Sequence, residues 1–264
     1  MRTKRTAIIL ITLIFALTAV ISIVGLFSVK KVSVNFAVSD KTDVKSIQKV
    51  LDGFLGDNLL LVKDGEVEQV LKGYHYVEVV SVKKEFPNVL SVSVRERREI
   101  YYVKGGQEYF VTTEDGFVLK SIEECEFSGN TSRDKILLDL KGLSITSATI
   151  GNYLKTDNDV LLNTLFKMAK SVNLTDCIKS IELSKFSDIA DIGEYNAVFE
   201  TYSGTKLKVE NMEEDGVDKT INAFSVYDNI LTDYQKACGE IQSYKMVDGK
   251  YRVTYEQTPV WTSD

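Results

Sequence analysis

The sequence predicts an α+β protein with an N-terminal transmembrane helix, a small domain of order β-α-α-β-β, and a larger β-rich domain with flanking helices. Three observations predict it. The run from Ala7 to Phe27 carries no charged residue. Residues 28–97 then alternate between the apolar spacing of strands and that of helices. The rest of the chain is mostly short β-prone runs separated by turn residues.

The uncharged run from Ala7 to Phe27 is long enough to cross a bilayer. At about 1.5 Å per residue it spans about 31 Å, against a hydrocarbon core of about 30 Å. Arg2, Lys4 and Arg5 precede it, and cytoplasmic flanks favour Lys and Arg. We therefore expect a single-pass protein of the cell membrane, with residues 1–6 in the cytoplasm and the bulk of the chain outside.

Two other interpretations of this run are less favoured. A cleaved signal peptide has an apolar core of about 7–15 residues and an Ala-x-Ala-like cleavage site, whereas this run is longer and ends in Ile23-Val24-Gly25-Leu26-Phe27. A helix buried in a soluble protein would show a polar face, and no polar face interrupts the run.

Charge and cysteine content exclude several classes of function. Residues 28–97 have a net charge of +1 and residues 98–264 a net charge of −10, so the distal part repels nucleic acid and anionic headgroups. The change near residue 97 indicates a domain boundary. The cysteines are widely spaced, with no CxxC pair, which argues against a zinc or redox motif. We expect free or buried thiols, with one disulfide as the alternative, among Cys125, Cys177 and Cys238.

The domain after the apolar run opens with a strand and two helices. The strand-like run extends from Ser28 to Phe36, and Thr42 or Asp43 can cap the first helix through a side-chain oxygen. The second helix ends at Gly73. The apolar positions at helical spacing are Val44, Ile47, Leu51 and Phe54 in the first helix, and Val67, Val70 and Leu71 in the second.

Two β-prone runs complete this domain. They extend from Tyr76 to Glu85 and from Leu90 to Val94, on either side of Phe86-Pro87-Asn88. In the second run, apolar residues alternate with Ser and Arg, as in a strand with one wet face. The pair predicts an antiparallel hairpin.

This hairpin resembles the POTRA domain of the bacterial cell-division family FtsQ/DivIB. The family pattern V-x-x-A-x-V-x-[KR]-x-x-P-x-x-L-x-I-x-V-x-E-R fits Val77 to Arg97, and Gly56-Asp57-Asn58-Leu59 is similar to its G-x-N-L. A departure is Phe36, which stands where the first strand usually runs into a Gly. The residues that match directly are Val77, Val82, Lys84, Pro87, Leu90, Val94, Glu96 and Arg97.

The distal part predicts a β-rich domain over residues 98–256, followed by a tail, 257–264. We expect strands at 100–103, 108–112, 117–119, 178–183, 195–201 and 206–209. We expect one helix over 157–170, with Val160, Leu161, Leu165 and Met168 inward, and another over 217–231, with Val217, Ile221, Phe224 and Ile230 inward. The resemblance places the lysine of a family helix at Lys219. Asp248-Gly249 predicts a last hairpin between 241–247 and 250–255.

No catalytic, cofactor or metal motif is present in the sequence. His75 is the only histidine, which excludes His triads and HExxH zinc sites within the chain. Ser121 is followed three positions later by Glu124, where a penicillin-binding-type S-x-x-K motif requires Lys. The acidic run Glu213-Glu214-Asp215-Gly216 lacks the spacing of a calcium loop. We therefore expect no enzyme activity, no cofactor, no metal and no nucleic-acid partner.

The last hairpin is the candidate binding site. A terminal hairpin often leaves a sheet edge open, and an open edge accepts a strand from another chain. In the resembling family, the partner adds its strand here, which points to Tyr244, Met246, Tyr251 and Tyr255 as contacts. The family has Asp and Arg where this chain has Gln242 and Tyr244. A one-residue shift of the alignment would exchange the two faces, and inward packing of these residues remains the alternative.

The resemblance implies a divisome scaffold at the division septum. Such a protein is anchored by residues 7–27, has a POTRA domain over 28–97, and binds FtsB/DivIC-type and FtsL-type partners outside the membrane. A POTRA-bearing envelope-assembly or secretion factor is the alternative, but it should carry several POTRA copies or a barrel. An anchored cell-wall hydrolase or transferase would need a catalytic motif, and none is recognisable.

Overall fold

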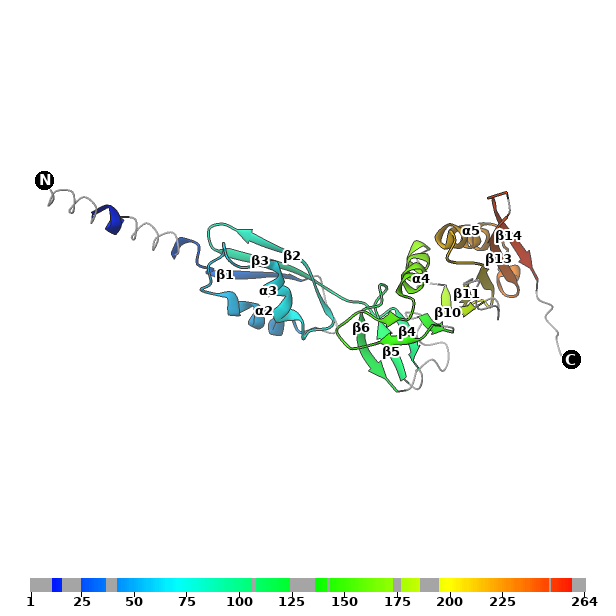
Figure 1. Ribbon diagram of the computed structural model, residues 1–264, viewed down its shortest axis with the longest axis horizontal. Helices are drawn as coiled ribbons and strands as arrows, with labels where there is room; N and C mark the ends of the chain where they lie inside the picture. Colours follow the sequence, from blue (N-terminus) through cyan, green and yellow to red (C-terminus); the bar gives the residue numbers. More distant parts are fainter. Residues whose placement is uncertain are drawn as a thin grey trace. The chain divides into compact units, whose positions relative to one another are not determined.

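The computed structural model describes residues 11–15, 25–36, 42–105, 108–123, 136–141, 143–172, 177–185, 195–246 and 248–257. Most of the predicted membrane segment from Ala7 to Phe27, Cys125, and the tail after Gln257 lie outside these ranges. Within them, no helix has the length and apolar character needed to cross a membrane. The chain divides into two compact units, Met1–Arg97 and Arg98–Asp264, which are described in turn (Figure 1).

The first unit is a three-stranded sheet covered on one face by helices α2 and α3 (Figure 1). Its strand order is β1-β3-β2. The predicted antiparallel hairpin is confirmed as β2 and β3, and the first strand joins it in parallel with β3. The elements are β1 (Lys31–Phe36), α2 (Val44–Leu51), the 3₁₀ turn η1 (Asp52–Phe54), α3 (Asp64–Leu71), β2 (Val77–Glu85) and β3 (Val89–Glu96).

Of the two predicted capping residues, the structure selects Asp43. Its carboxylate accepts hydrogen bonds from the Lys45 amide at 3.0 Å and from the Ser46 hydroxyl at 2.8 Å, and these bonds lower its pKa. Helix α2 then buries Ile47 and Leu51 against the sheet. The predicted inward positions Val44 and Val70 are exposed, because each helix buries only a narrow stripe.

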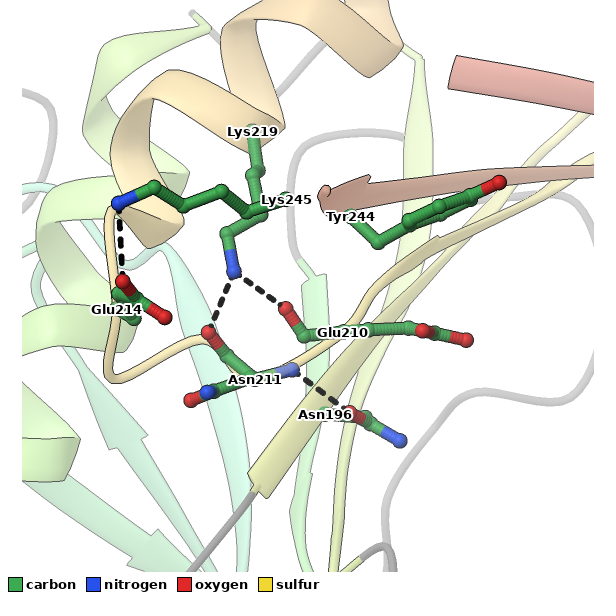
Figure 2. A pocket seen from close by; sticks show the side chains of 7 residues that line it. All are labelled: Asn196, Glu210, Asn211, Glu214, Lys219, Tyr244 and Lys245. Carbon is green, nitrogen blue, oxygen red and sulfur yellow. Dashed lines mark hydrogen bonds and ion pairs between the residues drawn. The ribbon is translucent and has the colours of Figure 1, made fainter. Parts of the chain in front are cut away.

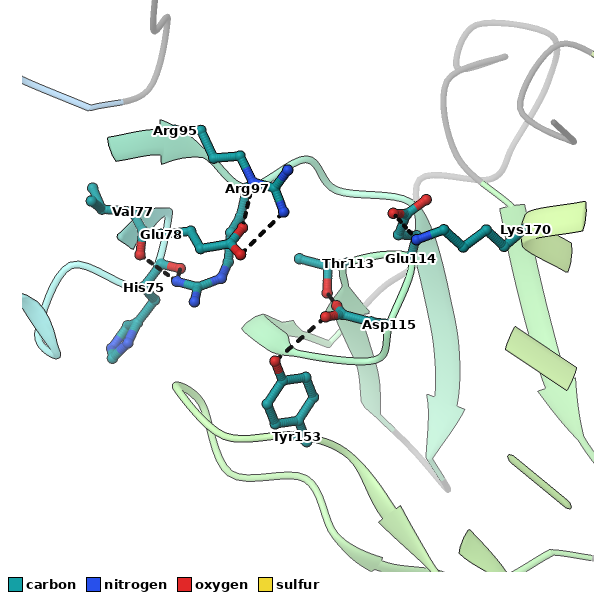
Figure 3. A network of polar contacts seen from close by, with 10 residues as sticks. All are labelled: His75, Val77, Glu78, Arg95, Arg97, Thr113, Glu114, Asp115, Tyr153 and Lys170. Carbon is teal, nitrogen blue, oxygen red and sulfur yellow. Dashed lines mark hydrogen bonds and ion pairs between the residues drawn. The ribbon is translucent and has the colours of Figure 1, made fainter. Parts of the chain in front are cut away.

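The last residues of the POTRA-like motif fasten the end of the first unit. The Arg97 guanidinium donates to the carbonyl of His75 at 3.2 Å and to that of Val77, which ties the end of β3 to the start of β2. Arg95 pairs with Glu78 through two bonds of 2.7 and 3.1 Å across the same strands, as Figure 3 shows. These contacts show the structural role of the arginine in the family's terminal E-R, which is to join the two strands of the hairpin.

The second unit is built on a nine-stranded sheet. Its order is β14-β13-β12-β11-β10-β7-β4-β5-β6. The strands are β4 (Tyr101–Gly105), β5 (Glu108–Thr112), β6 (Val118–Ile122), β7 (Ile136–Leu140), β10 (Ile178–Lys185), β11 (Tyr195–Thr201), β12 (Lys206–Val209), β13 (Glu240–Lys245) and β14 (Tyr251–Glu256). A separate two-stranded sheet pairs β8 (Ile145–Ser147) with β9 (Lys155–Thr156).

The helices of the second unit pack on this sheet. Helix α5 (Gly216–Asn229) contacts β12, β13 and β14 and lies beside α4 (Asp159–Ser171) (Figure 1). A short helix, α6 (Asp233–Lys236), leads into β13. The sequence analysis predicted both long helices, but it did not predict α6, β7, β8 or β9.

The prediction of which face of α5 is inward was half right. Of the four residues expected inward, Phe224 is buried and Val217 packs against the core, whereas Ile221 and Ile230 are exposed. Ile230 lies at the end of the helix, beyond its last full turn. The buried stripe is rotated because it contains a lysine and a threonine, and it consists of Gly216, Lys219, Thr220, Ala223, Phe224 and Tyr227. Val160 of α4 is likewise exposed, although the sequence placed it inward.

Candidate partner-binding edge

Strand β14 forms one end of the nine-stranded sheet. Within the described part of the chain, β13 is its only hydrogen-bonded neighbour. The two strands form the antiparallel hairpin that Asp248-Gly249 predicts, with Gly249 at φ 81° in the turn. An end strand has a row of backbone N–H and C=O groups on its free side.

The direction of the β13 backbone follows from its bonds to β12. The carbonyl of Ser243 accepts from the Glu210 amide at 3.0 Å, so Ser243 turns its backbone toward β12. Because backbone direction alternates along a strand, the neighbours Gln242 and Tyr244 turn theirs toward β14.

The register then identifies the groups on the open edge. Gln242 lies opposite Thr254, and Tyr244 lies opposite Arg252, so Thr254 and Arg252 bond to β13. The residues between and beside them point their backbone groups outward. The open edge is therefore formed by the backbones of Tyr251, Val253 and Tyr255.

The four residues predicted as partner contacts do not share one face. Ile241 belongs to the core and lies opposite Tyr255, so Tyr255 and Tyr251 lie on the face that α5 covers. Tyr244 lies on the other face, opposite Arg252, and Met246 follows β13 in the turn, exposed. Tyr244 and Met246 thus offer side chains to the outer side of the hairpin.

Tyr255 is held by packing and hydrogen bonds inside the unit. Its hydroxyl donates to the carbonyl of Cys238 at 2.7 Å and to that of Gln235 at 3.1 Å, and burial raises its pKa. Gly239 makes room for its ring: a Cβ there would come within 2.5 Å of the ring, at a φ of 145°. The contribution of Tyr255 to the edge is therefore its backbone.

A buried lysine supports the loop that joins β12 to α5. Lys219 is 1% exposed, and its ammonium donates to the carbonyls of Glu210 and Asn211, both at 2.7 Å (Figure 2). The Asn211 amide in turn donates to the Asn196 side chain at 3.0 Å. Burial lowers the pKa of Lys219, which the nearby carboxylates of Glu214 and Asp215 oppose.

A second lysine fastens the hairpin to the same loop. The Lys245 ammonium lies 2.9 Å from a Glu214 oxygen and 2.8 Å from an Asp215 oxygen. This contact raises the pKa of Lys245 and lowers that of Asp215. Tyr251, opposite Lys245 on β14, also hydrogen-bonds Asp215, and burial followed by this bond raises its pKa. The open edge is therefore fixed to the start of α5.

These groups surround a polar hollow of about 210 Å³ (Figure 2). Its lining is made of Asn196, Glu210, Asn211, Glu214, Lys219, Tyr244 and Lys245. Its two ammonium groups already bind the Glu210 and Asn211 carbonyls and the Glu214 carboxylate, so the residues around the hollow join the hairpin to the loop before α5. Within the described ranges, no group of three or more His, Cys, Asp or Glu side chains is placed to hold a metal ion. Of the two described cysteines, Cys177 is half-buried and Cys238 is buried.

Another polar network, drawn in Figure 3, stabilises the second unit at its other strands. The Thr113 hydroxyl donates to Asp115, which also accepts from the Tyr153 hydroxyl at 3.4 Å. Lys170 of α4 binds Glu114 at 3.0 Å. These residues fix the turn between β5 and β6 and take no part in the candidate edge.

Sequence reasoning missed Lys245, Gly239 and the acceptors of Lys219. Lys245 lies between the predicted contacts Tyr244 and Met246, yet its role depends on groups 30 and 31 residues away. The role of Gly239 depends on a backbone angle. The acidic run Glu213-Glu214-Asp215, considered above only as a calcium loop, was the one available signal for a lysine partner.

Comparison with known proteins identifies the first unit. Residues 27–97 match the family model described as POTRA domain, FtsQ-type. The β-α-α-β-β unit is therefore an FtsQ-type POTRA domain, as the motif from Val77 to Arg97 predicts.

Comparison over the whole chain confirms the resemblance to FtsQ/DivIB. The chain is 23% identical over 263 residues to the cell division protein DivIB of Clostridium botulinum, covering 98% of this chain and 91% of that protein. It is 24% identical over 167 residues to DivIB of Clostridium acetobutylicum, covering 63% and 64%. The chain is thus a relative of the DivIB proteins.

Among solved structures, the chain is similar to the major extracytoplasmic domain of the trans isomer of DivIB from Geobacillus stearothermophilus. The identity is 13%, the TM-score is 0.25, and the match covers 48% of this chain and 95% of that one. So loose a superposition adds nothing to the assignment.

Removing the Lys219 ammonium should destabilise the second unit. We expect Lys219→Met to cost about 2 kcal/mol, because two buried carbonyls lose their donor. Native-state hydrogen exchange of the α5 amides measures this in the full chain. Lys167→Met, at an exposed lysine of α4, is the matched control. Equal protection in both variants would show that the ammonium does not hold the loop.

The attachment of the hairpin by Lys245 should depend on pH. The pKa of Asp215 lies below its ordinary value of 3.8, so its contribution is complete above that value and is lost as pH falls through the folded pKa. We expect Lys245→Met to raise the hydrogen-exchange rates of β13 and β14 at pH 7, and the difference from the unsubstituted protein to vanish in stronger acid. Lys250→Met, which removes a lysine that lies 3.5 Å from Asp248 in the turn, should leave the rates unchanged at both pH values.

Proposed function

We propose that the protein is a non-enzymatic scaffold of the bacterial division machinery, working at the septum. Its similarity to DivIB over 98% of the chain supports a role in cell division. The observation that carries the scaffolding role is the open β14 edge, where Tyr251, Val253 and Tyr255 present backbone groups. No cofactor or metal enters this function.

The proposed partner is a strand from a membrane-anchored divisome protein of the FtsB/DivIC type, acting with an FtsL-type protein. A strand added beside β14 satisfies the outward N–H and C=O groups of three residues, and side chains beside it provide specificity. Tyr244 and Met246 on the outer side of the hairpin supply such side chains. Tyr251 and Tyr255 contribute mainly through their backbones.

We further propose that residues 7–27 anchor the protein in the cell membrane, with residues 1–6 in the cytoplasm and both folded units outside. The apolar length and the flank of Arg2, Lys4 and Arg5 support this topology. Confinement to the membrane raises the effective concentration of partners anchored in the same way. A modest interface at one sheet edge is then sufficient for assembly.

Blocking one edge donor should weaken partner binding and leave the hairpin intact. In Val253→Pro, the lost N–H points outward, so the pairing of β13 with β14 is kept, and proline is tolerated on edge strands. Val253→Ala trims the side chain but keeps the donor. We expect the proline variant to bind the DivIC-type protein of the same genome about 1 kcal/mol more weakly than the alanine variant, roughly five-fold in Kd. Equal binding would exclude strand addition at β14.

Charge on the outer face should also weaken binding. Tyr244→Glu places a carboxylate on the outer face of β13, one strand in from the proposed partner strand, and we expect a loss of about 1 kcal/mol or more in a quantitative pull-down with the same partner. Tyr234→Glu makes the same change at an exposed tyrosine of α6 and should have no effect. Unchanged binding of the Tyr244 variant would remove that residue from the interface.

A further inference from the structure

The POTRA unit exposes a group of large apolar side chains where the chain enters it. Leu61 is 71% exposed and Phe86 is 61% exposed, although the POTRA core itself is closed and well packed. We call this group the junction patch. It consists of Leu26, Leu55, Leu60, Leu61 and Phe86, all exposed.

Backbone and ring contacts gather the junction patch around Phe27. The Leu59 amide donates to the Phe27 carbonyl at 2.8 Å, which places the following leucines beside the chain entry. The Phe86 ring meets the Phe27 ring edge to face, with centroids 5.8 Å apart. Figure 1 shows the β2–β3 turn, which carries Phe86, at the end of the unit where the chain enters β1.

The entry of the chain is clamped and has no flexible linker. Ser28 forms a bridge with Asn58, the Val29 amide donates to the Asp57 carbonyl at 2.8 Å, and the Gly56 amide donates to the Val29 carbonyl at 2.9 Å. Since Phe27 is the last residue of the uncharged run, the junction patch lies directly beside the end of that run. Whatever surrounds Phe27 must also meet Phe86, whose ring contacts that of Phe27.

Basic residues border the patch. The Lys84 ammonium donates to the Leu60 carbonyl at 3.0 Å, which holds a positive charge beside the leucines. The exposed lysines nearby in the chain are Lys30, Lys31, Lys63 and Lys83, and the exposed acids there are Asp57, Asp64 and Glu85. Apolar side chains flanked by lysines are the composition that inserts into the headgroup and acyl boundary of a bilayer.

We propose that the junction patch lies in the outer interface of the bilayer that residues 7–27 enter, so that the POTRA unit is seated on lipid instead of hanging free. This inference rests on the proposed membrane anchor. Leu61 and Phe86 reach the acyl boundary, about 5–10 Å deep for interfacial apolar side chains, and the lysines meet lipid phosphates. The seating fixes the direction in which the POTRA unit leaves the membrane.

Depth-dependent quenching tests this seating in the full chain. Trp261, the only tryptophan, is replaced by Phe, and single tryptophans are introduced as Phe86→Trp or Leu61→Trp. Each variant is reconstituted in vesicles of phosphatidylcholine and phosphatidylglycerol brominated near the headgroup. We expect brominated lipid to remove about half of the fluorescence at both positions, in keeping with interfacial insertion, and aqueous iodide to quench little.

Val80→Trp is the matched control. Val80 lies on β2, the strand that leads into Phe86, and is 57% exposed, but it is about 20 Å from Phe86 along the chain. It should be quenched by iodide and not by brominated lipid. Iodide quenching at all three positions would overturn the proposal, as would protection of Phe86→Trp that depends on protein concentration, because the patch would then contact a second copy.

Phe15→Trp separates this inference from the anchor on which it rests. If residues 7–27 span the bilayer, lipid brominated deep in its acyl chains quenches this position. Absence of that quenching defeats the anchor itself. Quenching at Phe15→Trp without quenching at Phe86→Trp and Leu61→Trp defeats only the seating of the POTRA unit.

Discussion

The second unit depends on the buried ammonium of Lys219. A charged group in the interior is tolerated only when its hydrogen bonds are made, and here the carbonyls of Glu210 and Asn211 make them at 2.7 Å. Glu210 and Asn211 directly follow β12 and begin the loop to α5. The lysine therefore joins the helix to the end of the strand beneath it. The same loop supplies Glu214 and Asp215 to Lys245. The loop that Lys219 holds is therefore also the loop to which the terminal hairpin is attached.

Sequence reasoning predicted the elements that depend on local patterns. The β2–β3 hairpin, the Asp43 cap and the last hairpin each follow from neighbouring residues, and the structure contains them. The parallel pairings of β1 with β3 and of β12 with β13 join strands far apart in the sequence, and no local pattern encodes them. Strand β7 was missed for a related reason, since it is a short run between two parallel neighbours.

The inward face of α5 shows why apolar periodicity alone does not identify the buried face of a helix. The apolar residues Val217 and Ile221 indicate one stripe, but the loop after β12 supplies carbonyl acceptors to Lys219 and the helix supplies one to Thr220. Polar residues with hydrogen-bond partners can replace apolar residues in a core. A hydropathy pattern does not indicate which polar residues will find such partners. The faces of Tyr244, Tyr251 and Tyr255 were unpredictable in the same way, because they depend on the register of β13 against β12.

An edge that binds through its backbone places few demands on side-chain identity. What strand addition requires is that three outward N–H and C=O pairs be held in line, and this depends on Gly239, Lys219 and Lys245. The family's Asp and Arg appear here as Gln242 and Tyr244, both on the outer face of the hairpin, where substitution changes specificity and leaves the backbone in place. Under the proposed function, the backbone of the edge can therefore keep one mode of binding while the outer side chains select a different partner sequence.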